Sequence, residues 1–482
     1  MNQEISPVKQ EEKTQQEQNS AEDFSIEHPL QNICCTSIGP SYGASIGLAL
    51  DAIVVFPCCD SQTDDEGIVA SSDFHVQFPI SSPPKGSEQL QYRILLQING
   101  NAVKESFLSM KLPMQGKGTM CLFEQGCSTK PSTDKLQQLV HQRILSPGRN
   151  LIRYILVKNN PAAKNLKSDE GGINQNASSS YTTIGQTEAY VYLWSVHDTI
   201  VISDIDGTVT KSDVRGVIDS IFTEKYGHVH DGVCSFFSEI VKFKKAHEGD
   251  KGKVRVLYLS SRPMRLIHST RKFLSLLSQT NPEFQTPSQR TSILSCMNAC
   301  DIDIDAKPVE GKGPVGLPPG PIFLHTGTLS TVLMTELVKK TTHEFKADLL
   351  ARQVVLPFVA AGKEKSGSRL FLAGFGNKKT DSLAYEMVGM NTHDIYIINK
   401  NSILVSTNAA LEFEDEVQSE GTDVVGCFAW EPMICTEDLS SEKISVSNPD
   451  KATNTESQKK RHFKGYGDPK LKNELLLRIS TH

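Results

Sequence analysis

The sequence predicts an α/β fold, a doubly wound, Rossmann-like domain joined to a β-sandwich. Short strand-like runs separated by Gly, Pro, Ser and Asn clusters fill residues 52–124, a pattern typical of an antiparallel sandwich. From residue 199 onward, short apolar runs alternate with helical periods, which indicates buried parallel strands connected by helices. The chain has 482 residues, which suits about two to four domains.

Composition and charge exclude several classes of protein. Hydrophobic residues make up 38% of the chain and charged residues 22%, so wholesale disorder is excluded. The net charge of −6 leaves no global basic field for nucleic acid. The apolar runs are far shorter than the roughly 20 residues that cross a bilayer. With no signal peptide and eleven cysteines that we expect to be reduced, we predict a protein of the cytoplasm or nucleus.

The N-terminal half is expected to supply most of the sandwich. Residues 1–34 are polar and low in complexity, so we predict a disordered tail. Residues 35–128 hold the first sandwich strands, and residues 129–183 are predicted to be a linker with the remaining ones. The β-rich runs are Ile53–Phe56, Phe74–Phe78, Tyr92–Leu96 and Met120–Phe123. Ala189–Trp194 is expected to be one more strand, with Tyr190, Tyr192 and Trp194 on one face and Ala189, Val191 and Leu193 on the other.

The α/β domain is predicted for residues 184–435, beginning with the last sandwich strand. Its expected buried strands are Thr199–Ser203, Val254–Ser260, Pro321–His325, Arg369–Ala373 and Asp394–Asn399. Helical spacing of apolar residues predicts helices at Met264–Gln279 and Leu329–Lys340. The aperiodic stretch Asn281–Leu317 indicates a surface insertion. Residues 436–482 are polar, and we predict a mostly disordered tail.

The strongest chemical signal follows the first of these strands. An apolar strand ends in Asp204, Ile205, Asp206, Gly207 and Thr208. Two carboxylates two residues apart are expected on the same side of a strand, just past its carboxyl end, where open α/β sheets bind ligands. Like charges this close need a cation, and their hard oxygens suit Mg²⁺. One carboxylate could attack phosphorus while the other transfers a proton. A surface turn is the commoner use of such a triplet, but the apolar strand argues against it.

Three further segments supply matching groups, each with a simpler explanation. Ser260 follows another apolar strand and could hold a phosphoryl oxygen, although the next serine could merely cap a helix. Lys346 lies in a helical stretch and could neutralise phosphoryl charge, although most lysines are solvated. Asn377 and Asp381 follow a glycine-rich turn and could complete an oxygen-ligated metal site, unless that turn only reverses the chain.

These residues resemble the haloacid dehalogenase superfamily and, within it, the lipin-type Mg²⁺-dependent phosphatidate phosphatases. The resemblance runs from about Glu188 to Val405. It rests on these segments: Val201–Asp213, His230–Gly232, Tyr258–Arg262, Leu317–Pro321, Phe345–Lys346 and Gly374–Asp381. A second resemblance, to the family's amino-terminal region, rests on Asp51–Val55, Ser72–Phe78, Ile98–Gly100 and Met110–Leu112. It implies that the amino-terminal region and the strand before the signature form one immunoglobulin-like sandwich.

The resemblance also implies an activity and a role for each site residue. The activity would be hydrolysis of phosphatidic acid to diacylglycerol and phosphate in glycerolipid synthesis. Asp204 would be the nucleophile that forms an aspartyl-phosphate, and Asp206 the general acid and base. The residues expected to bind the phosphoryl group are Thr208, Ser260 and Lys346. Thr208 would also orient the loop. The expected Mg²⁺ ligands are Asp204, Asp206, Asn377 and Asp381.

Such a substrate lies at a membrane surface, so we expect peripheral association with the endoplasmic reticulum and no transmembrane segment. Ser41–Leu50 matches the family's amphipathic helix but is short and glycine-rich. The basic run Lys459–Lys464 could bind anionic lipid or act in nuclear import. Two alternatives stay open. A non-catalytic phosphatidate-binding module would lack the full aspartate pair, whereas a haloacid dehalogenase-type phosphatase acting on another phosphoester would keep it.

Overall fold

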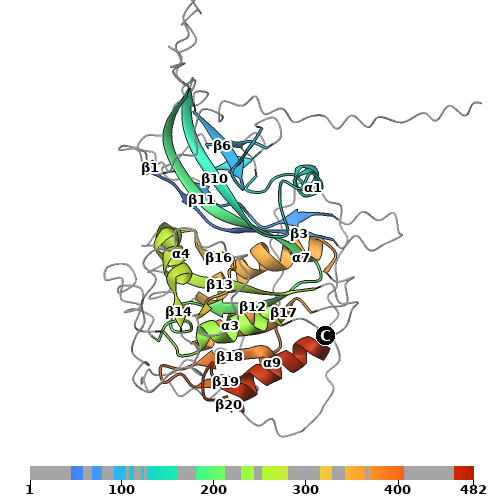
Figure 1. Ribbon diagram of the computed structural model, residues 1–482, viewed down its shortest axis with the longest axis vertical. Helices are drawn as coiled ribbons and strands as arrows, with labels where there is room; N and C mark the ends of the chain where they lie inside the picture. The colour runs from blue at the N-terminus through green and yellow to red at the C-terminus, as the bar shows by residue number, and fades with distance from the viewer. Residues whose placement is uncertain are drawn as a thin grey trace, which may run out of the picture.

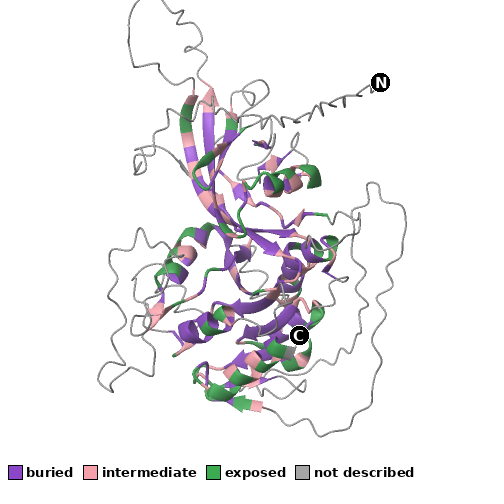
Figure 2. Cartoon of the chain, turned by 45° about the vertical axis from the view of Figure 1, so that its right-hand side comes forward, coloured by how far each residue is buried: buried purple, intermediate pink, exposed green. Residues whose placement is uncertain are grey.

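The computed structural model describes most of both halves of the chain. The described residues are 45–57, 68–78, 92–104, 108–112, 121–123, 128–159, 181–211, 229–243, 252–279, 315–327, 342–363, 369–406 and 461–481. Figure 1 shows a curled N-terminal sheet above an α/β unit. Figure 2 shows that the central strands of the α/β unit are buried between its helices.

The N-terminal sheet has the order β4-β3-β11-β10-β6-β8-β9, with β1 beside β11 and β7 beside β6. Its strands are β1 (Ser45–Ile46), β3 (Ala52–Phe56), β4 (Ala70–Ser71), β6 (Tyr92–Ile98), β7 (Asn101–Val103), β8 (Met110–Lys111), β9 (Leu122–Phe123), β10 (Gly148–Asn159) and β11 (Tyr181–Ser195). Helix α1 (Thr133–His141) precedes β10, and β2 (Leu48–Ala49) pairs separately with β5 (Val76–Gln77). Most of the predicted strands are therefore confirmed. A second large sheet facing this one does not occur among the described residues, so the immunoglobulin-like sandwich stays a prediction.

Strand β11 joins the two halves of the chain because both of its faces are buried. Ala189, Val191 and Leu193 pack into the core of the N-terminal sheet. On the other face, Tyr192 and Trp194 pack into the core of the α/β unit. The period-two alternation of this strand predicted these two faces, and the structure confirms them.

The second sheet has the order β16-β13-β12-β17-β18-β19-β20. Its strands are β12 (Thr199–Asp204), β13 (Val254–Pro263), β16 (Ile322–His325), β17 (Phe371–Gly376), β18 (Ile395–Ile398), β19 (Leu404–Ser406) and β20 (Arg461–Phe463). The first five strands of the order are parallel, and the last two extend the sheet in antiparallel fashion. The chain passes from β12 to β13 and β16 on one side, then to β17 and β18 on the other. This reversal at β12 creates the crevice in which such sheets bind ligands.

Helices cover both faces of this sheet, as a doubly wound fold requires. They are α3 (Val233–Lys242), η5 (Met264–Leu266), α4 (Ile267–Leu276), α6 (Thr342–Leu350), η8 (Ala351–Val355), α7 (Leu356–Ala360), α8 (Lys379–Met387), η10 (Thr392–Asp394) and α9 (Pro469–Thr481). Apolar residues of α3, α4 and α9 share one core, whereas those of α6, α7 and α8 share another with β3 and β11. The α/β prediction is therefore confirmed.

Several boundaries differ from the sequence-based expectation. The helix predicted over Met264–Gln279 begins with a 3₁₀ turn, and its last two residues form β14 (Ser278–Gln279), which pairs with β15 (Val315–Gly316). The helix predicted at Leu329–Lys340 lies outside the described residues, as does most of the predicted insertion. The segment matched to an amphipathic helix is extended over its described part, forming β1 and β2. A Cβ at Gly47 would lie 2.7 Å from the ring of Phe78, so the glycine permits this close pairing.

The prediction of disorder is wrong for residues 461–481, which form β20 and α9. Leu471, Leu475 and Ile479 recur every four residues along α9 and are all buried in the core shared with α3. Helical spacing of apolar residues thus overrides the polar character of the surrounding segment, because burying this stripe stabilises the helix.

Candidate active site

The catalytic loop, named for the nucleophile predicted in it, comprises residues 204–210 and begins where β12 ends, at Asp204. The backbone N–H groups of Thr208, Val209 and Thr210 all donate hydrogen bonds to the carbonyl of Ile205. Gly207 has a φ of +81°, a conformation that glycine adopts without strain. The loop is therefore a tight turn at the carboxyl edge of the central parallel strand.

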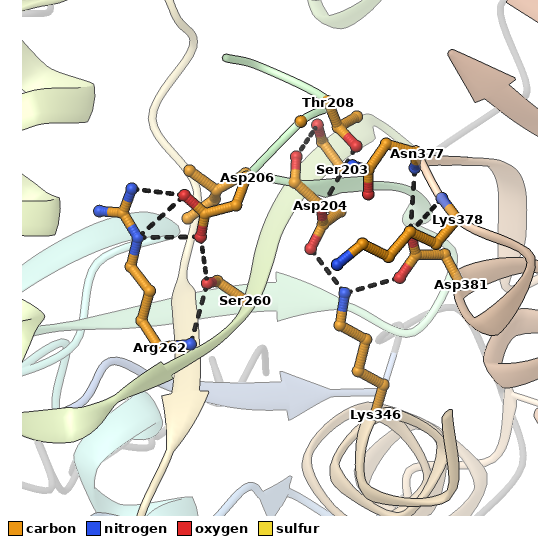
Figure 3. A network of polar contacts seen from close by, with 12 residues as sticks. Ser203, Asp204, Asp206, Thr208, Ser260, Arg262, Lys346, Asn377, Lys378 and Asp381 are labelled. Carbon is orange, nitrogen blue, oxygen red and sulfur yellow. Dashed lines mark hydrogen bonds and ion pairs between the residues drawn. The ribbon is translucent and has the colours of Figure 1, made fainter. Parts of the chain in front are cut away.

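Asp204 lies in a buried network with Lys346 and Asp381, which Figure 3 shows from close by. The Lys346 Nζ is 2.6 Å from Asp204 Oδ1 and 2.7 Å from Asp381 Oδ1. The Thr208 hydroxyl donates to the other Asp204 oxygen over 3.3 Å. Burial raises the pKa of Asp204 to about 7, although the Lys346 charge lowers it. The two carboxylates outweigh burial at Lys346 and raise the pKa of its ammonium well above the usual value, so the lysine is charged.

Asp206 faces a different cation. The Arg262 guanidinium binds both of its oxygens, with Nη2 at 2.6 Å from Oδ1 and Nε at 2.9 Å from Oδ2. The Ser260 hydroxyl also donates to Oδ2 over 2.9 Å. In Figure 3 the carboxylates of Asp204 and Asp206 point to opposite sides. The expectation that they share one side is wrong, because the strand ends at Asp204 and the chain turns before Asp206.

Arg262 is the site residue that the sequence reasoning missed. Its side chain is buried and its Nη1 donates to Thr270 of α4 over 3.1 Å. Strand β13 continues to Pro263, past the expected end at Ser260, so period-two alternation places Ser260 and Arg262 on the same side. The two-residue spacing of Ser260 and Arg262 was the sequence feature that could have identified Arg262 as a site residue.

Asn377 and Asp381 occupy the turn between β17 and α8. Asp381 Oδ2 accepts backbone N–H groups of Asn377 and Lys378 over 2.9 and 3.0 Å, and thereby caps α8. Burial raises the pKa of Asp381, but the Lys346 charge and these hydrogen bonds hold it below its ordinary value. The structure thus places Asp381 as a buttress of the turn that carries Asn377.

The four predicted metal ligands are not all directed to one point. No group of three or more His, Cys, Asp or Glu side chains within the described ranges is arranged around a common metal position. Asp206 is paired with Arg262, and both oxygens of Asp381 accept hydrogen bonds. Asp204 and Asn377 offer the carboxylate and amide oxygens that Mg²⁺ prefers. The residues present therefore fit a hard cation at the Asp204 end of the site.

Two buried side chains hold the backbone of the catalytic loop. His230 lies 3.3 Å from the carbonyl of Gly207 through Nε2 and 2.8 Å from the hydroxyl of Ser402 through Nδ1. Because a carbonyl only accepts, Nε2 carries the proton and Nδ1 accepts from Ser402. The Tyr466 hydroxyl, just before α9, donates to the carbonyl of Thr208 over 3.1 Å. The loop is thus fixed from two sides.

The arrangement suits transfer of a phosphoryl group. A buried carboxylate next to a fixed cation can act as a nucleophile, and the cation can stabilise negative charge as it develops on the transferred group. A second carboxylate two residues on can exchange a proton. The structure therefore brings Asp204, Thr208, Lys346 and Asp381 into direct contact, and places Asp206 and Ser260 in a second cluster.

Comparisons with known proteins identify the family of this chain. The family model described as LNS2 (Lipin/Ned1/Smp2) matches residues 133–292 and 306–420, together more than half of the chain. Phosphatidate phosphatase PAH1 of Arabidopsis thaliana is 29% identical over 278 residues, which cover 57% of this chain and 25% of the relative. Phosphatidate phosphatase LPIN1 of Homo sapiens is 24% identical over 253 residues, which cover 52% of this chain and 23% of the relative. Phosphatidic acid phosphohydrolase 1 of Saccharomyces cerevisiae is 29% identical over 216 residues, which cover 44% of this chain and 20% of the relative. The matched part thus spans only a fifth to a quarter of the length of these relatives.

Proposed function

The chain belongs to the LNS2 (Lipin/Ned1/Smp2) family, and we propose that it is a phosphatidate phosphatase, hydrolysing phosphatidic acid to diacylglycerol and inorganic phosphate. The observation that supports this most directly is the buried Lys346 ammonium, which contacts both Asp204 and Asp381 at the carboxyl end of β12. The names of the relatives support the choice of substrate, since they are phosphatidate phosphatases.

In the first step, an oxygen of Asp204 attacks the phosphorus atom and forms an aspartyl-phosphate. The bond from phosphorus to the glycerol oxygen breaks, and Asp206 gives that oxygen its proton, so that diacylglycerol leaves neutral. Lys346, already 2.6 Å from Asp204, lies beside the group being transferred and stabilises its charge. Ser260 is the second candidate to hold a phosphoryl oxygen.

In the second step, water attacks the aspartyl-phosphate. Asp206 takes a proton from that water, the bond between phosphorus and Asp204 breaks, and inorganic phosphate leaves. Both oxygens of Asp206 accept hydrogen bonds from Arg262 in the structure. Asp206 must therefore release at least part of this pair before it protonates the leaving oxygen.

Mg²⁺ is part of the proposal. Asp204 and Asn377 are the side chains whose oxygens would hold it, together with the backbone carbonyl of Asp206, and Asp381 would buttress the Asn377 turn. When bound, the ion would neutralise negative charge on the phosphoryl group. The support is the purely oxygen character of these donors.

The proposed substrate also implies a place of action. None of the helices within the described part of the chain is long and apolar enough to cross a bilayer. We propose peripheral association with the cytoplasmic surface of the endoplasmic reticulum, where the enzyme would act in glycerolipid and triacylglycerol synthesis. The described part of Ser41–Leu50 is extended, so it does not support that segment as the docking helix.

A phosphate-release assay tests the function. The full chain is incubated with phosphatidate in mixed micelles, with glycerol 3-phosphate and with p-nitrophenyl phosphate, each with Mg²⁺ or with EDTA. We expect release from phosphatidate to dominate, to require Mg²⁺ and to follow the surface fraction of phosphatidate. Asp204→Asn is the matched control. Binding to phosphatidate vesicles without release would indicate a non-catalytic module, and preference for a soluble ester would indicate another phosphatase.

A further inference from the structure

A reciprocal hydrogen-bonded pair connects the N-terminal half to the catalytic half. Gln353 Nε2 donates to Asp73 Oδ2 over 2.6 Å, and the backbone N–H of Asp73 donates to Gln353 Oε1 over 2.8 Å. Both polar atoms of the Gln353 amide are thus used on one partner, 280 positions earlier in the chain. The Gln353 side chain is buried, so an unmatched polar atom there would carry a large desolvation cost.

Asp73 is itself held firmly by the N-terminal half. The Thr129 hydroxyl donates to Asp73 Oδ1 over 2.6 Å, and the next residue, Phe74, donates its N–H to the carbonyl of Thr129 over 2.8 Å. Burial raises the pKa of Asp73, but hydrogen bonds from Thr129 and Gln353 and the charge of Lys130 bring it below its ordinary value. Asp73 is therefore an ionised, fixed acceptor at neutral pH.

Gln353 lies at an unusual point of the helix that carries Lys346. The helical run α6, η8 and α7 is continuous, and η8, Ala351–Val355, is a π-helical turn. Such turns are rare and are frequently found at functional sites. A π turn contains an extra residue, so it changes which side chains of the helix face the N-terminal half. Here the turn coincides with the residue that binds Asp73.

Lys346, on the α6 part of the same helical run, must be placed accurately relative to the carboxylates that it contacts. Lys346 lies seven residues before Gln353, and its Nζ contacts the buried carboxylates of Asp204 and Asp381 over 2.6 and 2.7 Å. Leu350 and Phe358 of the helical run pack in one core with Ile53 of β3 and Trp194 of β11. Apolar packing holds the helix against both sheets, but it is less directional than hydrogen bonding. A rotation or shift of the helix would move Lys346 away from the carboxylates.

We infer that Asp73, acting through Gln353, is a positioning residue of the active site: it sets the place of the helix that brings Lys346 to Asp204. The inference rests on the proposed function, because it gives Lys346 the task of stabilising the phosphoryl group. It assigns the N-terminal half a part in catalysis that is separate from any contact with lipid. The hydrogen bonds that hold the Asp73 and Gln353 side chains in the described part of the chain join them to each other and to Thr129.

Gln353→Glu is the test substitution, since it keeps size and shape but places a carboxylate against the ionised Asp73. We expect kcat on dioctanoyl phosphatidate to fall about 10- to 100-fold, the loss typical of a misplaced catalytic group. Asp73→Asn combined with Gln353→Glu exchanges amide and carboxylate: the side-chain hydrogen bond re-forms with its direction reversed, and the backbone N–H of residue 73 still donates to the side chain of residue 353. We expect this double variant to recover kcat to within about threefold of the original.

Two controls separate positioning from a general loss of stability. Arg352→Gln changes the exposed neighbour of Gln353 and should leave kcat unchanged. In the Lys346→Ala background, Gln353→Glu should cause no further loss of kcat, because its effect passes through Lys346. An unchanged kcat in Gln353→Glu, no recovery in the double variant, or an equal further loss in the Lys346→Ala background would overturn the inference.

Failure of the inference can be told apart from failure of the proposed function. If the original chain releases phosphate from p-nitrophenyl phosphate but not from phosphatidate, the proposed substrate is wrong, and the same variants are then compared on p-nitrophenyl phosphate. If the original chain is active on phosphatidate while the variants behave as it does, only the positioning role is wrong. Should Gln353→Glu fail to fold, the double variant, which restores the pairing, decides the matter by its kcat.

Discussion

His230 allows a test of the loop geometry by pH. Its ring is fully buried and braces the catalytic loop through the carbonyl of Gly207. Burial lowers the pKa of His230 to about 4, although the hydrogen bond to Gly207 raises it. The unfolded chain binds a proton at His230 with the ordinary pKa of 6.5. Between these two values only the unfolded chain takes up the proton, so the free energy of unfolding falls as pH falls from about 6.5 to about 4.

The magnitude follows from the width of that interval. A difference of one pKa unit corresponds to about 1.4 kcal/mol, so His230 removes about 3 kcal/mol of stability once the pH has fallen from 6.5 to about 4. At pH 5, about 2 kcal/mol of this has already been lost. His230→Gln keeps a donor for Gly207 and an acceptor for Ser402 but does not titrate. Its destabilisation relative to the original chain should therefore be about 2 kcal/mol smaller at pH 5 than at pH 7.5.

Urea unfolding of both chains, followed by tryptophan fluorescence at pH 7.5 and pH 5, measures this difference. His141→Gln, on the exposed end of α1, is the matched control and should show the same stability difference at both pH values. The His230→Gln chain should also retain phosphate release at pH 7.5, since the loop keeps its brace. An equal loss of stability in His230→Gln at both pH values would refute the reasoning, because it would mean that the buried ring does not titrate between them.

Four further outcomes are expected. Asp204→Asn and Asp206→Asn should each lower phosphate release by about three orders of magnitude or more with an unchanged circular dichroism spectrum, because nucleophile and acid act as one unit; activity near the original would contradict their roles. Lys346→Ala should lose less, about 100-fold in kcat, since it stabilises charge without making bonds. A chain lacking residues 1–179 should be insoluble or inactive, because the face of β11 formed by Ala189, Val191 and Leu193 loses its partners in the N-terminal sheet; a soluble, active product would show an independent domain. Removing residues 461–481 should lower the urea midpoint and phosphate release together, and an unchanged midpoint would contradict the packing of α9.

The sequence was sufficient for the parallel sheet and for most of the catalytic edge. Apolar runs bounded by Gly, Asp and Ser marked β12, β13 and β17, because strands buried on both faces need no polar alternation. The carboxyl ends of parallel strands meet at one edge, so the sequence alone assigns Asp204, Ser260 and Asn377 to the same edge of the sheet.

The rest depends on contacts that no local pattern encodes. The Asp206 side chain points toward Arg262 because the chain turns between the end of β12 and Asp206. That turn decides which cation the Asp206 carboxylate contacts. The pairing of Asp73 with Gln353 joins positions far apart, one of them on a π turn that ordinary helical spacing does not predict. The sequence of helix α9 contains an apolar stripe at helical spacing. The prediction of disorder was nevertheless made for this segment, because it followed the polar residues before the helix.

The contacts of Asp51 show why the N-terminal half belongs to the catalytic fold. Its carboxylate, buried at the start of β3, accepts the N–H of Ile322 in β16 over 3.0 Å and a hydrogen bond from Arg271 of α4 over 2.8 Å. The same Asp51 oxygen that binds Arg271 accepts the N–H of Tyr190 in β11 over 2.9 Å. One carboxylate therefore ties the N-terminal sheet to the edge strand and to a covering helix of the catalytic sheet. Together with the Asp73–Gln353 pair on the opposite face, it fixes the catalytic sheet at two separate points, so the two halves must fold together for either to keep its buried polar groups paired.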